Sequence, residues 1–232
     1  TPELIPGYDI YFSFTGGPTL ERLETEFGSP SARALYCSVD ASRYAPLPIE
    51  KRWDLTYLGT YSDDRQPTLE KLLVEAARRC PDKRFAVAGP QYPDTIDWPA
   101  NVERIEHLPP VEHAGFYSAS RFTLNVTRAD MIAAGWSPSV RLFEAGACGT
   151  PIISDRWDGI EDVLEPGHAI ILADSTEDVV TALEQDATRL GEAARAAVLS
   201  GHTAECRAAQ LEHDLKQASM AGTTRGDLCE QI

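Results

Sequence analysis

The feature that most constrains this chain is a repeated alternation between short apolar segments and longer amphipathic ones. From residue 54 onward, the sequence predicts strands over 55–58, 85–88, 102–105, 122–126, 152–154 and 169–172. Between and after these strands it predicts helices over 68–79, 111–118, 139–147 and 160–164, and over most of the chain after 175. Strands that alternate with helices are typical of a parallel sheet with helices on both faces. The sequence therefore predicts an α/β fold with a doubly wound, Rossmann-like parallel sheet.

A single β-α-β unit precedes this alternation. The sequence predicts a strand over 9–15, a helix from Pro18 to about Phe27 and a second strand over 34–38. Two strands and one helix are too small to bury their own faces. We therefore interpret the unit as a remnant of a second domain, and we expect the C-terminal helix to pack against it. Because the chain opens on Thr1 and not on Met, we also expect that an upstream segment has been removed.

The predicted organisation has three parts. Residues 1–48 form the end of an N-terminal domain and a linker, 49–200 form the doubly wound domain, and 201–232 form a C-terminal helix with a polar tail near Gly222. Within the second part, Ser175 and Asp178 have the spacing of a capping box at the start of a helix.

Composition excludes several classes of function. The formal net charge of −15 argues against binding to the phosphates of a nucleic acid, because such binding needs a basic face. No apolar run approaches the roughly 18 residues that a membrane span needs. The five cysteines are odd in number, widely spaced and without a C-x-x-C pair. This usage favours a reducing, cytoplasmic setting over a disulfide or zinc framework.

Ligands of open α/β sheets bind outside the carboxyl ends of the strands, so the turns at that edge are the first candidates for a site. Glycine allows a phosphate to approach the backbone, and arginine pairs with the anion. Neither G-x-G-x-x-G nor G-x-x-x-x-G-K-[ST] occurs, and a strand that ends in glycine is also an ordinary turn. The candidates at these turns are Gly59, Thr60 and Arg65 after the first strand, Gly89 after the second, and His107 and Leu108 after the third.

The most informative stretch runs from 125 to 155. Ser139 and Val140 begin a predicted helix, whose free N–H groups and dipole favour an anion. Arg141 and Glu144 are three residues apart and share one face of that helix. In one interpretation Glu144 accepts both hydroxyls of a ribose while Arg141 and the helix start hold a diphosphate. In the other, the two side chains form a surface ion pair of little energetic value.

This stretch resembles a known family. R-L-F-E-A-G-A-C-G-T-P-I-I-S-D, at 141–155, resembles the donor-binding segment of the GT-B glycosyltransferases. Together with L-N-V-T-R-A-D-M, G-W-S-P-S-V-R-L-F-E and D-R-W-D-G, it is similar to the spore-maturation (CgeB-like) group of that superfamily. The resemblance covers about 54–211, and 38–46 resembles the linker that enters the C-terminal domain. It implies the C-terminal domain of a GT-B enzyme, hexosyltransferase-like, which moves a sugar from a nucleoside-diphosphate sugar to an unknown acceptor.

The resemblance also implies roles for individual residues. Glu144 corresponds to the residue that binds the donor ribose, and we expect Glu144→Ala to weaken nucleotide binding with little change in stability. Retaining members carry a second glutamate eight residues earlier, where this chain has Trp136, so retention or inversion stays open and the catalytic residues stay unidentified. Asp130 and Arg128 are candidates to replace it. The other implied donor contacts are Ser139 and Val140 at the diphosphate, Gly59, Thr60 and Arg65 at the first turn, and His107 and Leu108 at the base.

No cofactor or metal is expected, because GT-B enzymes generally need none and Asp63-Asp64 has the pattern of a solvated turn. The expected partners are the nucleotide sugar and its acceptor. Two alternatives remain open: a GT-B-fold epimerase, and a non-catalytic nucleotide-sugar-binding or structural protein, which Trp136 favours. Hydrolysis of a nucleotide sugar, or transfer from it, separates an enzyme from a binding protein.

Overall fold

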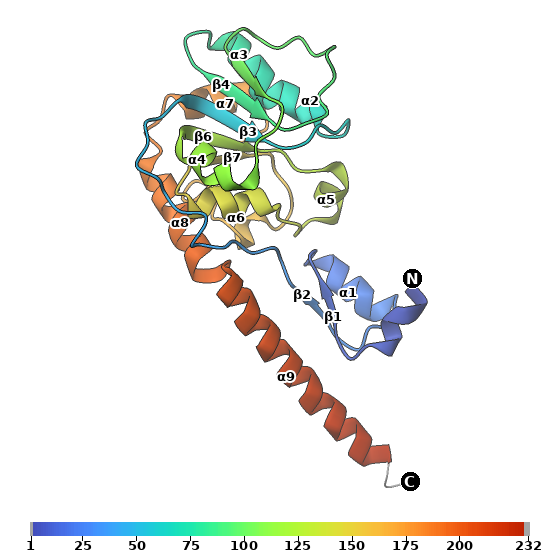
Figure 1. The fold of residues 1–232 in the computed structure, drawn as a ribbon. Helices are drawn as coiled ribbons and strands as arrows, with labels where there is room; N and C mark the ends of the chain where they lie inside the picture. Colours follow the sequence, from blue (N-terminus) through green and yellow to red (C-terminus); the bar gives the residue numbers. More distant parts are fainter. Residues whose placement is uncertain (1, 230–232) are drawn as a thin grey trace.

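The computed structural model describes residues 2–229, with side chains described as far as 218. Its centre is a six-stranded sheet in the order β5-β4-β3-β6-β7-β8, in which all neighbours are parallel (Figure 1). The strands are β3 (Trp53–Leu58), β4 (Phe85–Ala88), β5 (Val102–Ile105), β6 (Ser120–Asn125), β7 (Ile152–Ser154) and β8 (Ile171–Leu172). The sheet confirms the predicted α/β fold, and β4, β5 and β7 have the predicted bounds.

Helices cover both faces of this sheet. Alternate residues of a strand point to opposite faces, so Ala86 and Ala88 of β4 pack in one apolar cluster while Phe85 and Val87 pack in the other. The first cluster includes residues of α4 (His113–Ser118), α6 (Val140–Ala147) and α8 (Thr188–Gly201). The second includes residues of α2 (Gln66–Leu69), the π-helical turn η2 (Glu70–Val74), α3 (Glu75–Arg79) and α7 (Thr176–Leu183). Ser175 and Asp178 form the expected capping box before α7.

Some local predictions were wrong. Helix α5 (Ala129–Ala134) was not predicted, because none of its residues is buried and it carries no apolar periodicity. The strand expected over 34–38 is β2 (Ala32–Ala34), since its only partner, β1 (Tyr11–Ser13), ends opposite Ala34. The helix expected over 160–164 is the short 3-10 turn η4 (Ile160–Asp162). Helix α9 (Ala204–Cys229) continues past Gly222, where the sequence predicts the polar tail.

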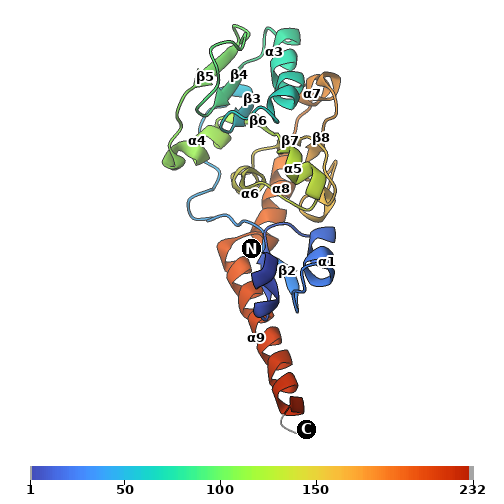
Figure 2. The same ribbon diagram turned by 90° about the vertical axis from the view of Figure 1, so that its right-hand side faces the viewer.

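The N-terminal unit stands apart from the sheet and beside α9 (Figures 1 and 2). It consists of η1 (Pro2–Gly7), β1, α1 (Pro18–Thr25) and β2. Its own core contains only three buried side chains, Ile5, Leu23 and Ala32. As expected, the C-terminal helix packs against it: Gln210 Nε2 donates to the Ala34 carbonyl at 2.7 Å.

The strand order reverses its direction of winding at the centre of the sheet, and we call the region at this point the crevice. From β3 the chain adds β4 and β5 on one side, and it then returns to add β6 on the other side of β3. In open α/β sheets, ligands bind where the direction of winding reverses, outside the carboxyl ends of the two central strands. Here that point lies between the ends of β3 and β6, at Leu58 and Asn125.

Candidate functional site

The crevice between β3 and β6 contains a buried arginine. Arg141, in the first turn of α6, is only 9% exposed. Its Nε donates to the Leu58 carbonyl at 2.7 Å, its Nη1 donates to Asn125 Oδ1 at 3.1 Å, and its guanidinium lies 4.9 Å from the centre of the Tyr57 ring. Within the described part of the chain, Arg141 forms no ion pair with Glu144. The surface ion pair considered as the alternative is therefore wrong.

The two glycine turns meet beside this arginine. A Cβ on Gly59 would lie 2.9 Å from Arg141 Nη2 and 2.6 Å from the Tyr57 hydroxyl. Gly89, at φ +136°, packs so tightly that its Cβ would lie 2.2 Å from the Gly59 carbonyl oxygen. Both positions require glycine, because the turns contact each other and the guanidinium. The structure therefore brings Gly59, Gly89 and Arg141 together.

Helix α6 begins at the same place. Ser139 is its N-cap in extended conformation, but its hydroxyl donates to Asn125 Oδ1 at 2.7 Å and does not cap the helix. Among the described residues, the N–H groups of Val140 and Arg141 have no acceptor. Unpaired N–H groups at a helix start favour an anion. The helix start and the Arg141 guanidinium are thus neighbours in one crevice.

Glu144 lies one turn further along α6, in a cluster of partly buried groups. Its side chain is 15% exposed, the Tyr117 hydroxyl donates to its Oε2 at 3.3 Å, and His113 Nδ1 lies 3.9 Å from the same oxygen. The Tyr117 side chain is fully buried, and burial raises its pKa well above the usual value. Because Glu144 accepts from a buried hydroxyl, the expectation that Glu144→Ala leaves stability unchanged no longer follows from the structure.

The loop after β5 is connected to Glu144 through His113. His107 is exposed, whereas Leu108 is partly buried and its carbonyl lies 3.3 Å from His113 Nε2. His113 therefore stands between this loop and the carboxylate. The structure brings Leu108 and Glu144 to the same side of the crevice and leaves the His107 side chain in solvent.

The remaining arginine candidates lie on the rim loops. Arg65 Nη2 donates to the Thr60 carbonyl at 2.5 Å, and its Nε is buried with no hydrogen-bond partner among the described residues. Arg128 Nη1 donates to Ser62 Oγ at 3.2 Å and lies 3.8 Å from Asp64. The Asp64 carboxylate also accepts the Ala129 N–H at 3.0 Å, at the start of α5. Asp64 is therefore engaged between two loops and is not merely a solvated turn residue. The described residues contain no group of three His, Cys, Asp or Glu placed to hold a metal ion.

Trp136 connects the site to the N-terminal unit. Its carbonyl accepts the Gly16 N–H at 2.9 Å, and its indole Nε1 donates to Asp162 Oδ2 at 2.7 Å. The indole lies so close to Gly17 and Gly159 that a Cβ on either would be 2.4 Å from it. The Trp136 backbone has a φ of +41°, which is strained for a bulky residue. Trp136 thus occupies the junction of three segments.

Sequence reasoning did not select five residues that shape this site. A polar residue at the end of an otherwise apolar strand, as in L-N-V at 124–126, was the available signal for Asn125, because buried polar groups are nearly always hydrogen-bonded. No comparable signal marks the other four. The five residues are Asn125, Thr127 and Asp155 beneath Arg141, and His113 and Tyr117 beside Glu144.

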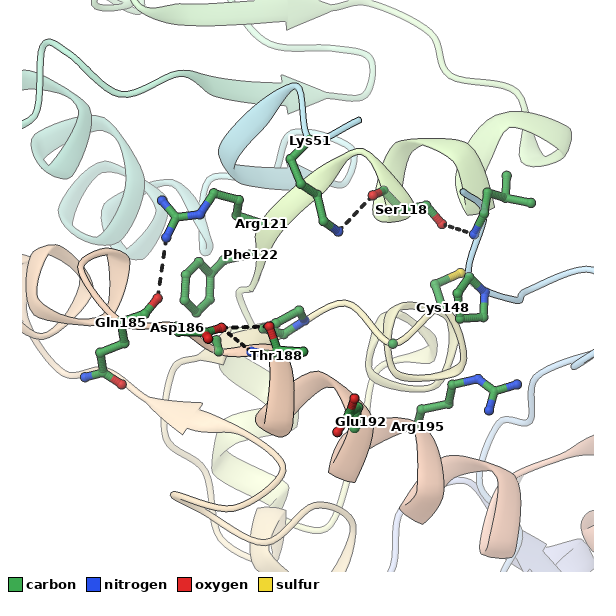
Figure 3. Close-up of a pocket in the computed structure, with 15 residues that line it drawn as sticks. Lys51, Ser118, Arg121, Phe122, Cys148, Gln185, Asp186, Thr188, Glu192 and Arg195 are labelled. Atoms are coloured by element: carbon green, nitrogen blue, oxygen red, sulfur yellow. Dashed lines mark hydrogen bonds between the residues drawn. The ribbon is translucent and has the colours of Figure 1, made fainter. Parts of the chain in front are cut away.

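A cavity of about 460 Å³ lies at the opposite, amino edge of the sheet (Figure 3). We call it the amino-edge cavity; it is lined by Lys51, Ser118, Arg121, Phe122, Cys148 and Arg195, with further residues of 46–47, 149–151 and 185–192. Two of its cations are already engaged, since Lys51 donates to the Ser118 and Ser120 carbonyls and Arg121 pairs with Asp54. The third, Arg195, has a buried Nε without a hydrogen-bond partner among the described residues. Despite its volume, the cavity has none of the groups that the sequence predicted for a ligand.

The glycosyl transferase-like family model matches residues 65–213, which is more than half of the chain. The chain belongs to the glycosyl transferase-like family. No curated protein matches the sequence. Consistent with this family, the fold is that of the GT-B glycosyltransferases.

Three solved structures illustrate the similarity. Sucrose-phosphate synthase from Thermosynechococcus elongatus has a TM-score of 0.72 at 17% identity, over 95% of this chain and 61% of that one. HepE from Anabaena, in complex with UDP-glucose, has a TM-score of 0.69 at 12% identity, over 90% of this chain and 64% of that one. TarM from S. aureus has a TM-score of 0.71 at 11% identity, over 94% of this chain and 45% of that one. The family member described here therefore spans less than two thirds of each structure. Within its described residues, no helix is long and apolar enough to cross a membrane.

Proposed function

We propose that this chain is the donor-binding part of a glycosyltransferase that uses a nucleoside-diphosphate sugar. The observation that carries the proposal is the first turn and a half of α6, where the free N–H groups, the buried Arg141 and Glu144 lie on one helix at the switch point of the sheet. Family membership and the similarity to HepE, which was solved with UDP-glucose, support the same assignment.

In this proposal the diphosphate lies at the start of α6. The N–H groups of Val140 and Arg141 and the guanidinium Nη2 donate to its oxygens, and charge-assisted hydrogen bonds of this kind are the strong ones. As the sugar leaves, negative charge grows on the diphosphate, and fixed donors stabilise it without reorganisation. Arg65 and Arg128 stand on the rim, and Gly59 and Gly89 form the closely packed turns beside Arg141 that the phosphates would face.

The ribose lies next to Glu144 and the base next to Leu108. The Tyr117 hydroxyl and His113 hold the Glu144 carboxylate from behind, so its orientation is set before a nucleotide binds. His113 also contacts the Leu108 carbonyl, which joins the ribose and base contacts into one unit. His107 and Thr60 complete the proposed set as exposed contacts on the two loops.

We further propose that binding needs no metal or cofactor, that the protein is cytoplasmic, and that it is related to the spore-maturation (CgeB-like) group. Metal independence rests on the donors already present for the diphosphate, and the cytoplasmic location rests on the cysteine usage. The relation to the CgeB-like group rests on the motifs at 124–131 and 135–144. The acceptor, the sugar and the stereochemical outcome are outside the proposal.

Calorimetric titration of UDP and GDP, with and without EDTA, tests this function. We expect one of the two nucleotides to bind, and to bind equally in EDTA. If neither nucleotide binds, the assignment as a donor domain fails; if EDTA abolishes binding, metal independence fails.

A second function is favoured by one observation, the placement of Trp136. The position that an acidic residue occupies in retaining members holds an indole packed against Gly17 and Gly159. A protein that binds a nucleotide sugar without transferring it would tolerate this replacement. Hydrolysis of UDP-glucose or GDP-mannose by the full-length protein supports an enzyme, whereas binding without turnover supports the non-catalytic alternative.

A further inference from the structure

Asn125, at the end of β6, uses the full hydrogen-bonding capacity of its carboxamide although it is fully buried. Its Oδ1 accepts from Ser139 Oγ at 2.7 Å and from Arg141 Nη1 at 3.1 Å. Its Nδ2 donates to Ser154 Oγ at 2.9 Å and to Thr127 Oγ1 at 3.2 Å. A carboxamide has two donors and two acceptor sites, and all four are used here.

The direction of each of these bonds follows from chemistry. A guanidinium has only donors, so the atom that faces Arg141 must be the carboxamide oxygen. The nitrogen must then face Thr127 and Ser154, whose hydroxyls accept from it and are left to donate onward. Both hydroxyls do so to Asp155: Thr127 Oγ1 donates to Asp155 Oδ1 at 2.8 Å, and Ser154 Oγ donates to the Asp155 carbonyl at 2.9 Å and lies 3.3 Å from Oδ1.

The network therefore runs from a buried cation to a buried anion. Arg141 is at one end and Asp155, which is 7% exposed, is at the other, with the amide dipole of Asn125 between them. Burial raises the pKa of Asp155, while hydrogen bonds from Thr127 and Ser154 and the charge of Arg141 oppose that rise. Fully satisfied buried networks hold their members rigidly.

One guanidinium nitrogen of Arg141 is not used in this network. Nε and Nη1 of Arg141 are bound to Leu58 and Asn125, whereas Nη2 has no hydrogen-bond acceptor among the described residues and faces the turn at Gly59. The same Asn125 oxygen holds the Ser139 hydroxyl at the start of α6. One side chain thus fixes both the free guanidinium nitrogen and the first residue of the helix.

We propose that Asn125 is a positioning residue, which aims Arg141 Nη2 and the start of α6 at one diphosphate group. Asn125 is buried behind the Arg141 guanidinium and the start of α6, and it does not touch the anion. The assignment of the anion to a nucleotide rests on the proposed function, but the positioning itself requires only that a diphosphate binds in the crevice.

Inorganic pyrophosphate is the probe that tests the positioning directly. In calorimetric titration, Asn125→Ala is expected to weaken pyrophosphate binding about 10-fold, the equivalent of one misplaced charge-assisted contact. Ser120→Ala is the matched control: Ser120 is a fully buried polar residue of the same strand, bonded to Thr56 and Phe116 at the other edge of the sheet. It should lower the melting temperature and leave pyrophosphate affinity within about 2-fold of wild type.

A double-mutant cycle separates positioning from a general loss of structure. If Asn125 acts through Arg141, Asn125→Ala should change pyrophosphate affinity by less than about 2-fold once Arg141→Gln is present. Independent, additive losses would overturn the proposal. Should Asn125→Ala not fold, Thr127→Val replaces it in the cycle, because it removes only one hydroxyl of the network and predicts a smaller loss with the same dependence on Arg141.

The outcomes distinguish this proposal from the function. Pyrophosphate binding that depends on Asn125 through Arg141, with no binding of UDP or GDP, supports the positioning role and refutes the nucleotide site. Nucleotide binding that is insensitive to Asn125→Ala refutes the positioning role and leaves the function intact. If wild-type protein does not bind pyrophosphate or either nucleotide, both proposals are wrong.

Discussion

The two edges of the main sheet both contain charged groups but use them differently. At the carboxyl edge, Arg141 and Asn125 are held by the protein on one side while donors of Arg141 and of the start of α6 stay unpaired on the other. At the amino edge, the Lys51 ammonium donates to two backbone carbonyls and Arg121 pairs with Asp54. Among the described residues, unpaired donors therefore cluster around the start of α6 at the carboxyl edge, whereas at the amino edge the buried Arg195 Nε is also left without a partner.

Cavity size alone would have suggested the other edge. The amino-edge cavity has the volume of a small-molecule pocket. However, burial lowers the pKa of Lys51, so this environment disfavours its charged form, and both hydrogen bonds that its ammonium donates among the described residues go to backbone carbonyls. The proposed anion site therefore rests on free donors beside a fixed cation and not on empty volume.

The largest expected effect is that of Glu144→Ala. Loss of its carboxylate removes the proposed ribose contacts, which lowers nucleotide affinity roughly 10- to 150-fold. It also leaves the buried Tyr117 hydroxyl without an acceptor, which costs about 1–3 kcal/mol of unfolding free energy. Calorimetry and melting curves measure the two effects. Glu144→Gln is the control, because it keeps an acceptor for Tyr117; a variant that melts earlier but binds nucleotide as wild type does would remove Glu144 from the site.

The second-largest effect is expected for Gly59→Ala, which should lower nucleotide affinity about 10-fold. Its Cβ would meet the Tyr57 hydroxyl and Arg141 Nη2, so the guanidinium must move away from the turn. Gly115→Ala, in α4, is the matched control, because a Cβ there meets nothing within 4 Å. If both alanine variants bind nucleotide equally well, the turn at Gly59 is not part of the carboxyl-edge site.

Acid should lower the free energy of unfolding through His202, a residue that belongs to neither edge of the sheet. Burial, together with the Arg207 charge, lowers the pKa of His202 from 6.5 to about 4. The unfolded chain therefore binds the proton first, and stability falls as pH drops from 6.5 towards 4. Allowing for the exposed part of the ring, the loss is about 1–2 kcal/mol. Urea unfolding of wild type and His202→Gln at pH 7 and 4.5 measures it; an equal loss in both proteins would assign the effect elsewhere.

The smallest effect is expected at the amino edge. Lys51→Met removes the ammonium that bridges the Ser118 and Ser120 carbonyls, and it should cost about 1 kcal/mol of stability or less. Nucleotide affinity should remain within about 2-fold of wild type, because the change lies at the other end of the strands. A larger loss of nucleotide binding would show that the two edges are not independent.

The layers of the fold were predictable because they depend on periodicity. Leu69, Leu72, Leu73 and Ala76 recur at helical spacing, and all four are buried on one face of the α2–α3 segment as expected. Helix α5 escaped prediction because it has no buried face. Sequence periodicity reports burial, and elements without burial leave no such signal.

The site was predictable only in part. Gly59, Ser139 and Arg141 come together because strand ends of a parallel sheet share an edge, which the strand pattern already implied. The side chain orientations were not predictable: Arg141 and Glu144 share a helix face in sequence, yet one contacts Asn125 and the other His113. The orientation of each side chain depends on contact partners that lie far away in the sequence.

The pairing of β3 with β6 has a consequence for how the protein reaches its native state. Arg141 meets Leu58 across 83 positions of the sequence, so the crevice exists only after a long loop has closed. Loop-closure entropy must be overcome before such contacts form, and parallel sheets are accordingly slow to assemble. During refolding, helix content is expected to return before the capacity to bind an anion, which makes ligand binding a reporter of the last step and not of the first collapse.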